Sequence, residues 1–270
     1  MKKILLTGAA GGVGGVLRTE YRETYELRLS DIVAIDDCSP NETFIQADLA
    51  DLEAARQIAA GVDGIIHLGG FSVEGDWETI LNANIIGARN LYEAARLEGV
   101  KRIVFASSNH AMGFYGRDET IDHTDQPRPD SRYGLSKVFG EALGRLYADK
   151  YGAEIFNIRI GNVGDEPLDV RRLAIWISHR DIAQLIAIGL EHPDITYETV
   201  YGMSDNKRAW WDNANAVRLG YAPMDKSEDY AESVLAGFAQ DTGDPLADSS
   251  QGGNFVSSEG GGAPALGKSD

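Results

Sequence analysis

The sequence predicts a doubly wound α/β fold, in which a parallel β-sheet is covered by helices on both faces. Short apolar runs such as KILLT (3–7) and RIVFA (102–106) alternate with helix-length amphipathic stretches. This alternation is typical of βαβ units, whose strands are buried on both sides. A chain of 270 residues, 43% of them hydrophobic, is also long enough to bury such a core.

Six strands are expected in the first part of the chain, at residues 3–7, 25–30, 43–47, 64–68, 102–106 and 154–160. After Gly161 the rhythm changes to a helix over 178–192, a strand over 195–202 and short helical stretches. We therefore expect a core over 1–161 and a small C-terminal lobe over 162–247. Ser178, three residues before Asp181, predicts a capping box at the start of the helix in this lobe. The glycine- and serine-rich residues 248–270 predict a mostly flexible tail.

The charge balance limits the partners that the chain can have. With 42 acidic against 25 basic residues, the formal net charge is -17. Such a surface repels nucleic acid and anionic membranes, so neither is expected as a partner. The acidity serves either simple solubility or adaptation to high salt, and the size of the charge excess favours a salt-loving source.

The remaining composition points to an intracellular protein without a metal. Cys38 is the single cysteine, which excludes an internal disulfide and a cysteine-built zinc site, so a reducing cytoplasm is expected. The apolar run Ile4 to Leu6 is far shorter than the roughly 7–15 residues that a secretion signal needs. None of the five histidines forms a metal-ligand pattern with its neighbours, and no metal site is predicted.

A glycine-rich turn follows the first predicted strand in KILLTGAAGGVGG. Gly8, Gly11 and Gly14 lie between this strand and the next helix, where glycine permits a tight turn and a close approach of the backbone to a pyrophosphate. A tight strand-to-helix turn alone would need the same residues. Together with the βαβ context, the turn predicts that residues 1–161 form a Rossmann core that binds a dinucleotide.

Two acidic residues at strand ends indicate which dinucleotide is bound. Asp31 closes the second strand 23 residues after Gly8, near the distance at which a carboxylate binds the adenosine ribose. No arginine follows Asp31 to receive a 2′-phosphate, so NAD is favoured over NADP. Asp48 ends the third strand, and we expect it either to contact the adenine or to cap a helix.

A second group of residues carries the expected chemistry. Tyr133 and Lys137 are four residues apart, which on a helix places both side chains on one face. Ser108 follows the fifth strand, at the sheet edge where ligands bind in open parallel sheets. A positive charge beside a tyrosine favours the phenolate, so Lys137 is expected to lower the pKa of Tyr133. Tyr133 could then act as a general base for an alcohol proton.

These residues give the chain a resemblance to a known family. TGAAGGVG, the set of Ser108, Tyr133 and Lys137, and Asn84 in NANIIG resemble the extended short-chain dehydrogenase/reductase superfamily over roughly residues 3 to 240. Six longer stretches together resemble, more narrowly, the uronate dehydrogenase family: HLGGFSVEG, NIIGARNLYEAAR, RIVFASSNHAMGFY, RPDSRYGLSKVFGE, AWWDN and QGGNFV.

The resemblance implies an activity and a set of site residues. Enzymes of this family oxidise the anomeric carbon of a hexuronic acid, giving the aldaric acid lactone and NADH. On this chain, Tyr133 would take the proton, Ser108 would bind the same oxygen, Lys137 would bind the nicotinamide ribose and Asn84 would complete a proton relay. A homo-oligomer is also implied. The cofactor site would further include Gly12, Val13, Leu49, Leu68, Gly69, Gly70 and Ile160, and the sugar site Ser72, Asn109, His110, Arg171 and Phe255.

A carboxylate substrate requires a local cation on a chain of this net charge. By the resemblance, Arg171 in DVRRLAIW would hold the carboxylate with two parallel charge-assisted bonds. The alternative is a surface ion pair with Asp165, Glu166 or Asp169. Phe255 covers the sugar site or anchors the tail on the surface or on a neighbouring subunit.

Several interpretations compete with these. Ser107 and Asn109 could merely satisfy backbone groups at a strand end, which we accept for Ser107, and Trp210 and Trp211 are expected to be core or interface residues. The first alternative function is a nucleotide-sugar epimerase or dehydratase, which shares the fold and the Ser, Tyr and Lys set but usually devotes a larger C-terminal region to the nucleotide. The second is a regulator that binds NAD without turnover. Release of NADH would distinguish a dehydrogenase that acts on free sugars from the epimerase and from the regulator.

Overall fold

Seven parallel strands form the centre of the computed structural model, which describes residues 1–237, 242–259 and 263–264. Their order in the sheet is β3-β2-β1-β4-β5-β6-β9, and every neighbouring pair is parallel. The chain direction across the sheet reverses between β1 and β4, which is where ligands bind in doubly wound folds. The predicted fold class is confirmed. The strands are β1 (Lys3–Thr7), β2 (Glu26–Asp31), β3 (Glu42–Gln46), β4 (Gly64–His67), β5 (Arg102–Ser108), β6 (Glu154–Ile160) and β9 (Tyr197–Gly202).

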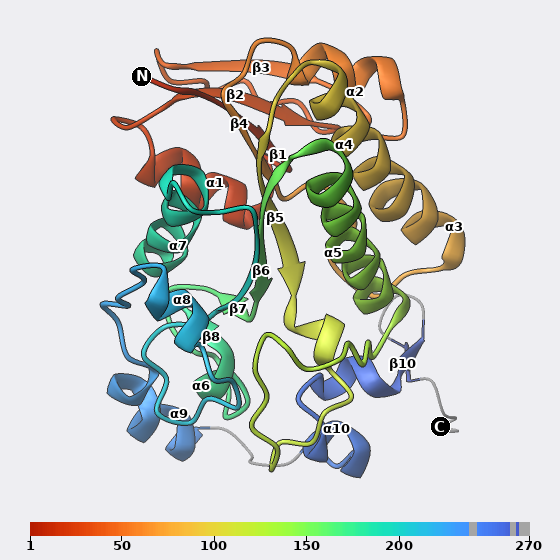
Figure 1. Cartoon of the computed structure of the whole chain (residues 1–270). Coiled ribbons are helices and arrows are strands. Elements are labelled where there is room, and N and C mark those ends of the chain that lie inside the picture. Colours follow the sequence, from red (N-terminus) through yellow and green to blue (C-terminus); the bar gives the residue numbers. More distant parts are fainter. Residues whose placement is uncertain (238–241, 260–262, 265–270) are drawn as a thin grey trace.

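Helices cover both faces of this sheet (Figure 1). One face packs against α1 (Gly12–Glu20) and α7 (His179–Glu191), the other against α2 (Leu52–Ala59), α4 (Gly87–Leu97) and α5 (Arg132–Tyr151). Because side chains alternate along a strand, β1 supplies Ile4 and Leu6 to one core and Leu5 to the other. Both faces are therefore buried, which explains why strands such as β1 and β4 consist largely of consecutive apolar residues.

Shorter elements complete the fold. Residues beyond Gly161 contribute both the edge strand β9 and a group of small elements, so the division at this residue stays a prediction. The small elements beyond Gly161 are β7 (Asn162–Val163), α6 (Arg172–Ile175), β8 (Trp176–Ile177), α8 (Ala214–Arg218), α9 (Ala231–Gly237), α10 (Pro245–Ser249), β10 (Ser258–Glu259) and β11 (Ala263–Pro264). A further short helix, α3 (Trp77–Ile80), precedes them in the chain.

The predicted capping box at the start of α7 forms only in part. The hydroxyl of Ser178 accepts a hydrogen bond from the backbone N–H of Asp181 at 3.2 Å, as expected for an N-cap. The carboxylate of Asp181 does not return to Ser178. It accepts bonds from the hydroxyl of Ser204 (2.6 Å) and the N–H of Met224 (2.7 Å). Asp181 thus connects α7 to the C-terminal segments instead of completing the box.

The expectation of a flexible tail is wrong for its first part. Gln251 is 1% exposed, and its side-chain amide donates to the carbonyls of Gly116 and Glu119 and accepts from the indole N–H of Trp211 at 2.9 Å. Glycine here allows close packing and not flexibility, since a Cβ on Gly252 would lie 2.1 Å from a carboxylate oxygen of Asp130. The tail residues 260–262 and 265–270 lie outside the described residues.

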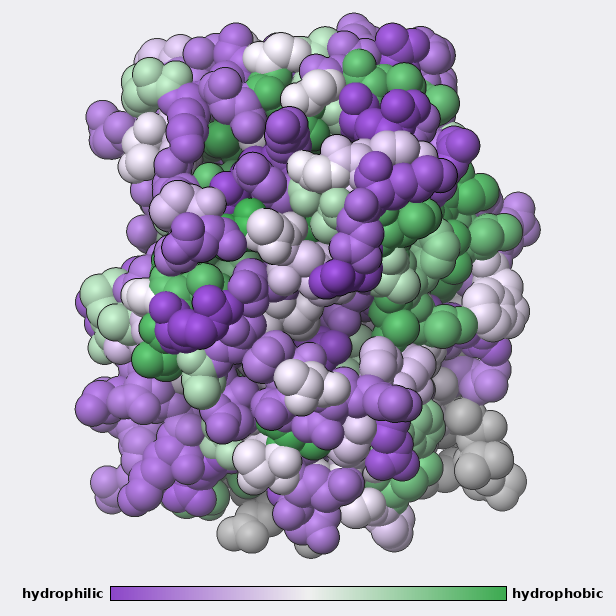
Figure 2. Space-filling view, in the orientation of Figure 1, coloured by the Kyte–Doolittle hydropathy of each residue, from purple (hydrophilic) through white to green (hydrophobic). Residues whose placement is uncertain are grey.

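The visible surface is mostly hydrophilic, as expected for a chain with a net charge of -17. Figure 2 shows hydrophilic residues over most of the visible face, with hydrophobic residues gathered on the side of α3 to α5. Within the described residues, no helix is both long enough and apolar enough to cross a membrane.

Candidate active site

A cavity of ≈ 760 Å³ opens at the carboxyl ends of the central strands. Its size is ordinary for a cofactor site. Its lining contains residues predicted for the cofactor site and for the substrate site: Gly8, Gly11, Gly12, Val13, Gly14, Asp31, Asp48, Leu49, Leu68, Gly69, Gly70, Ser72, Ser108, Tyr133, Lys137 and Ile160. Five predicted residues are not in its lining: Asn84, Asn109, His110, Arg171 and Phe255.

The glycine-rich turn is built for close backbone packing. Gly8 has a φ of 70°, and a Cβ on it would lie 2.8 Å from the backbone nitrogen of Gly69. A Cβ on Gly14 would lie 2.5 Å from the carbonyl oxygen of Gly8. The N-terminus of α1 has no side-chain cap and no acidic residue in its first turn. Its N–H groups are therefore available to an anion, and this cradle fits the pyrophosphate of a dinucleotide.

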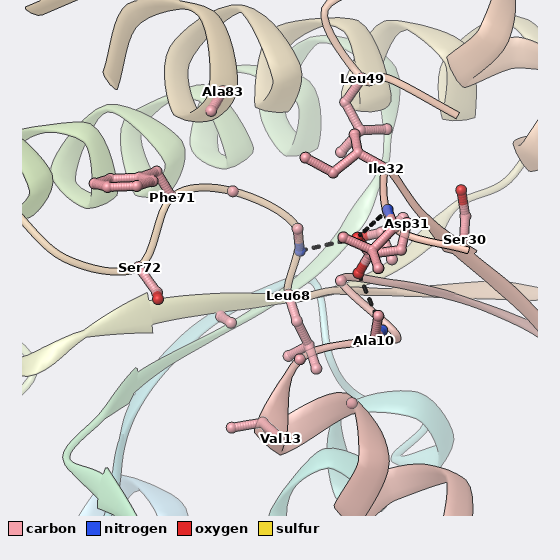
Figure 3. Close-up of a pocket in the computed structure, with 18 of the residues that line it drawn as sticks. Ala10, Val13, Ser30, Asp31, Ile32, Leu49, Leu68, Phe71, Ser72 and Ala83 are labelled. Atoms are coloured by element: carbon pink, nitrogen blue, oxygen red, sulfur yellow. Dashed lines mark hydrogen bonds between the residues drawn. The ribbon is translucent and has the colours of Figure 1, made fainter. Parts of the chain in front are cut away.

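Asp31 connects the turn to the end of β2. One carboxylate oxygen accepts from the N–H of Ala10 at 3.0 Å and the other from the N–H of Val33 at 3.0 Å, which leaves lone pairs on both for a ribose (Figure 3). Asp48 also lines the cavity and accepts from Ala50 N–H at 2.9 Å. The helix that follows is capped by Asp51, so the alternative of Asp48 as the cap is wrong.

Replacing Asp31 with alanine should weaken NAD binding. A hydrogen bond to a charged group contributes roughly 1.5–3 kcal/mol, which corresponds to about 10- to 150-fold in Kd. Calorimetric titration of NAD and NADP into both proteins measures the effect. Asp51→Ala is the matched control, because Asp51 also accepts two backbone N–H bonds, from Glu53 and Ala54, but does not line the cavity. A wild-type chain that prefers NADP would contradict the assignment.

Tyr133 and Lys137 lie one turn apart at the start of α5, as predicted. Ser131 caps this helix by accepting from the N–H of Gly134 at 2.9 Å. The ammonium of Lys137 donates to the carbonyl of Ala106 at 2.8 Å and lies 5.4 Å from the ring centroid of Tyr133. Both side chains are buried beside Ser108.

The expected lowering of the pKa of Tyr133 by Lys137 is not found in the chain alone. Burial raises the pKa of Tyr133 to about 12, although a hydrogen bond with Ser108 acts to lower it. Burial also lowers the pKa of Lys137 to about 8. Both shifts have the same cause, since a site shielded from water disfavours a charge on either side chain.

A buried ion pair beneath the site was missed by the sequence analysis. Glu141 binds the guanidinium of Arg159 with two bonds of 3.0 and 2.9 Å and accepts from the hydroxyl of Ser107 at 2.5 Å. The interpretation that the side chain of Ser107 satisfies a backbone group is therefore wrong. This network fixes α5 against β5 and β6. Glu141 follows Lys137 by four residues, so the same helical spacing could have revealed it.

Asn84 supports the loop that follows β4. It lies in a π-helical turn, Leu81–Ile86, and its amide oxygen accepts from the N–H of Phe71 at 2.7 Å. Its amide nitrogen donates to the carbonyl of Phe71 and to the hydroxyl of Ser136, both at 2.9 Å. The predicted role in a proton relay stays a prediction, whereas the amide itself holds the loop that carries Ser72.

The other predicted substrate residues form one cluster beside the cavity. With the amide of Asn109 oriented to satisfy both ends, its nitrogen donates to the carbonyl of Ile160 (3.1 Å) and its oxygen accepts from Arg171 (2.9 Å). The Nε of Arg171 donates to the carbonyl of Gln251 at 2.9 Å. The ring of Phe255 stacks on His110 at a centroid distance of 3.7 Å.

Arg171 has the properties of a receptor for an anion. In the part of the chain that the structure describes, no carboxylate lies within ion-pair distance of it, and Asp169 pairs with Arg172 instead. The alternative of a surface ion pair is therefore wrong for these residues. Burial lowers the pKa of Arg171 to about 10, and the charge of Arg117 acts in the same direction. A partly buried guanidinium that makes no ion pair favours a bound carboxylate.

The described residues contain no group of three or more histidine, cysteine, aspartate or glutamate side chains that could hold a metal ion. Trp211 packs flat against Tyr201 and binds Gln251, which fits the prediction of a core aromatic. The sequence analysis also missed Asp130, whose carboxylate lies 2.7 Å from Nδ1 of His110. Its position two residues before the first residue of α5, Arg132, in RPDSRYG is the signal that could have found it.

Comparison with known proteins matches this geometry. The model of the NAD dependent epimerase/dehydratase family matches residues 4–232. Uronate dehydrogenase from Pseudomonas putida is 49% identical over 90% of this chain and 91% of its own. Among solved structures, glucuronic acid dehydrogenase from Chromohalobacter salexigens has a TM-score of 0.92 and 46% identity, covering 94% of this chain and 96% of that one.

A third relative bears on the cofactor. A mutant of uronate dehydrogenase from Agrobacterium tumefaciens, solved in complex with NAD, has a TM-score of 0.91 and 44% identity and covers 95% of this chain and 97% of that one. The glycine cradle, Asp31 and the Ser108, Tyr133 and Lys137 set line one cavity, as an NAD-dependent oxidoreductase requires. The chain therefore belongs to the NAD dependent epimerase/dehydratase family and, within it, to the uronate dehydrogenases.

Proposed function

We propose that the chain oxidises the anomeric carbon of a hexuronic acid, galacturonate or glucuronate, to the aldaric acid lactone and passes the hydride to NAD. The observation that carries this proposal is Arg171, a partly buried cation bonded to Asn109, which directly follows Ser108. A sugar placed with its anomeric hydroxyl at Ser108 and Tyr133 could direct its carboxylate to Arg171.

Each side chain has a role that its surroundings support. Tyr133 takes the proton of the anomeric hydroxyl, and Ser108 binds the same oxygen. Lys137, which lines the cavity on the cofactor side, binds the nicotinamide ribose. Bound NAD supplies the hydride acceptor. Phe255 covers the sugar site from the tail and keeps water away from it, and Ser72 faces it from the loop after β4.

The formation of NADH tests the function. The full chain is incubated with NAD and, separately, galacturonate, glucuronate, galactose, and UDP-galactose. We expect an absorbance increase with the uronates only, with the lactone as the first product by NMR. Epimerisation of UDP-galactose without net NADH would instead support a nucleotide-sugar epimerase. NAD binding without turnover across the uronates would support a non-catalytic NAD sensor.

We also propose a cytoplasmic homo-oligomer. Its support is a group of exposed apolar side chains on the side of α3 to α5, among them Trp77 at 54%, Leu81 at 45%, Leu135 at 41% and Leu146 at 51% exposed. Apolar side chains gathered on one side are typical of an interface. Sedimentation equilibrium measures the number of subunits, and a monomer at micromolar concentration would contradict the proposal.

The acidity is proposed to be an adaptation to salt. At a net charge of -17 the folded chain repels itself, and salt screens that repulsion over a Debye length of about 3 Å at 1 M. The Tm should therefore rise markedly between low and molar salt. Scanning calorimetry in sodium chloride and in potassium chloride tests this. A Tm that stays flat or falls would leave the charge as ordinary solubility.

A further inference from the structure

Asp130 is a buried carboxylate at the substrate end of the site. It lies in the loop before α5, and its side chain has no exposed surface. One oxygen, Oδ2, is 2.7 Å from Nδ1 of His110, and the other, Oδ1, accepts from the hydroxyl of Ser131 at 2.7 Å. The backbone N–H of Asp130 also donates to the carbonyl of His110 at 3.2 Å. Side chain and backbone thus join the same two residues.

Glycines from three segments enclose this carboxylate. A Cβ on Gly113 would lie 1.8 Å from Oδ2, and one on Gly252 would lie 2.1 Å from the same atom. A Cβ on Gly134 would lie 3.1 Å from Oδ1 and 2.2 Å from the carbonyl oxygen of His110. The backbone therefore leaves room for the carboxylate and for little else. Such an enclosure keeps Asp130 in one orientation.

The imidazole of His110 is held equally firmly. Phe255 stacks on one face, with an angle of 22° between the ring planes, and the ring of Tyr133 meets it edge-on at 5.8 Å. Nδ1 faces Asp130, and Nε2, at the opposite end of the ring, makes no hydrogen bond with the described residues. Because a carboxylate only accepts hydrogen bonds, the nitrogen that faces it must carry the hydrogen.

The charge of Asp130 also affects two other side chains of the site. It acts to raise the pKa of Tyr133, in the same direction as burial, and so opposes formation of the phenolate. Toward Arg171 it acts in the favourable direction, by supporting the charged guanidinium.

We propose that Asp130 is a positioning residue that holds His110 as the neutral tautomer protonated on Nδ1, so that Nε2 accepts a hydrogen bond from a ring hydroxyl of the sugar. The proposal rests on the proposed function in one respect, that the ligand is a polyhydroxylated sugar. In this proposal the pair of Asp130 and His110 determines substrate specificity separately from Arg171. Arg171 binds the carboxylate of the sugar, and His110 accepts a hydrogen bond from one of its hydroxyls.

The tautomer can be observed directly in the full chain. Long-range ¹H–¹⁵N correlation spectra of protein labelled with ¹⁵N-histidine distinguish protonated from bare ring nitrogens, and the signal of His110 is identified by its loss in His110→Gln. We expect Nδ1 to be protonated and Nε2 to be bare at neutral pH. In Asp130→Asn this preference should be lost. A wild-type His110 that is protonated on Nε2, alone or together with Nδ1, overturns the proposal.

Kinetics test whether the tautomer matters for the substrate. We expect Asp130→Asn to raise KM for the uronate by about 3- to 30-fold, the range for one or two lost hydrogen bonds, with kcat within about twofold. In the background of His110→Gln the same substitution should change KM by less than about twofold, because the two residues act through one contact. Equal factors in both backgrounds, or a loss of NAD affinity, would mean a structural role only.

A series of uronates that each lack one ring hydroxyl identifies the hydroxyl that His110 contacts. One member should bind to the wild-type chain as weakly as the full sugar binds to Asp130→Asn, and should be insensitive to that substitution. If every member loses a further factor in Asp130→Asn, the proposal fails. Failure of the proposed function is separate, because no uronate would then give NADH with the wild-type chain, whatever the tautomer of His110.

Discussion

Tyr133→Phe should lower the turnover of uronates by about 10²–10⁴-fold or more while NAD still binds. The substitution keeps the ring, which lies against His110 and Lys137, and removes the phenol oxygen that, as a phenolate, would take the proton of the anomeric hydroxyl. Steady-state kcat from NADH formation and Kd from calorimetry separate chemistry from binding.

Tyr92→Phe is the control for loss of a buried tyrosine hydroxyl. Tyr92 is fully buried in α4, and its hydroxyl has no hydrogen-bond partner in the structure. Its removal should leave kcat unchanged, since Tyr92 does not line the cavity. Near-normal activity in Tyr133→Phe would assign the base to another group.

The pH dependence of the two proteins adds a second readout. Burial places the pKa of Tyr133 at about 12 in the chain alone, so the phenol is protonated at neutral pH. A reaction that requires the phenolate should therefore accelerate as pH rises from the acid side. The residual activity of Tyr133→Phe should lack that increase. A rise of the same slope in both proteins would show that a different group titrates.

The strands were predictable because each one carries its own signal. The β-branched and aromatic residues of EIFNIRI predict a strand, and β6 spans those seven residues. The end of β5 was less certain from sequence, because Ser107 and Ser108 are polar. In the structure the strand continues through Ser108, since Glu141 of α5 provides the partner that the hydroxyl of Ser107 needs.

The cofactor side was more predictable than the substrate side for a reason of sequence distance. Gly8, Gly14 and Asp31 belong to one βαβ unit, whose geometry follows from local rules. The substrate cluster combines residues from remote parts of the chain, such as Asn109 and Arg171. No local pattern indicates that Gln251, in a glycine-rich tail, fixes Arg171 through its carbonyl and is itself fixed by Trp211. Composition alone predicted flexibility there.

Arg171→Ala should remove most of the activity on uronates and narrow the gap between a uronate and a neutral hexose. A neutral sugar offers the same anomeric hydroxyl to Tyr133 and Ser108, so discrimination must come from the carboxylate end. Loss of one partner of a buried charged pair costs about 2–5 kcal/mol, or roughly 30- to several-thousand-fold in kcat/KM. The measurement is kcat/KM for galacturonate and galactose in both proteins.

Arg172→Ala is the matched control, because it removes the same charge from the next position, where the guanidinium pairs with Asp169 and not with the cluster. It should keep the preference for uronates. Arg171→Lys separates charge from geometry, since an ammonium keeps the charge but cannot bind Gln251 and Asn109 with the same planar fork. If Arg171→Ala lowers kcat/KM for galacturonate and galactose by one common factor, the arginine holds the tail in place and another cation reads the carboxylate.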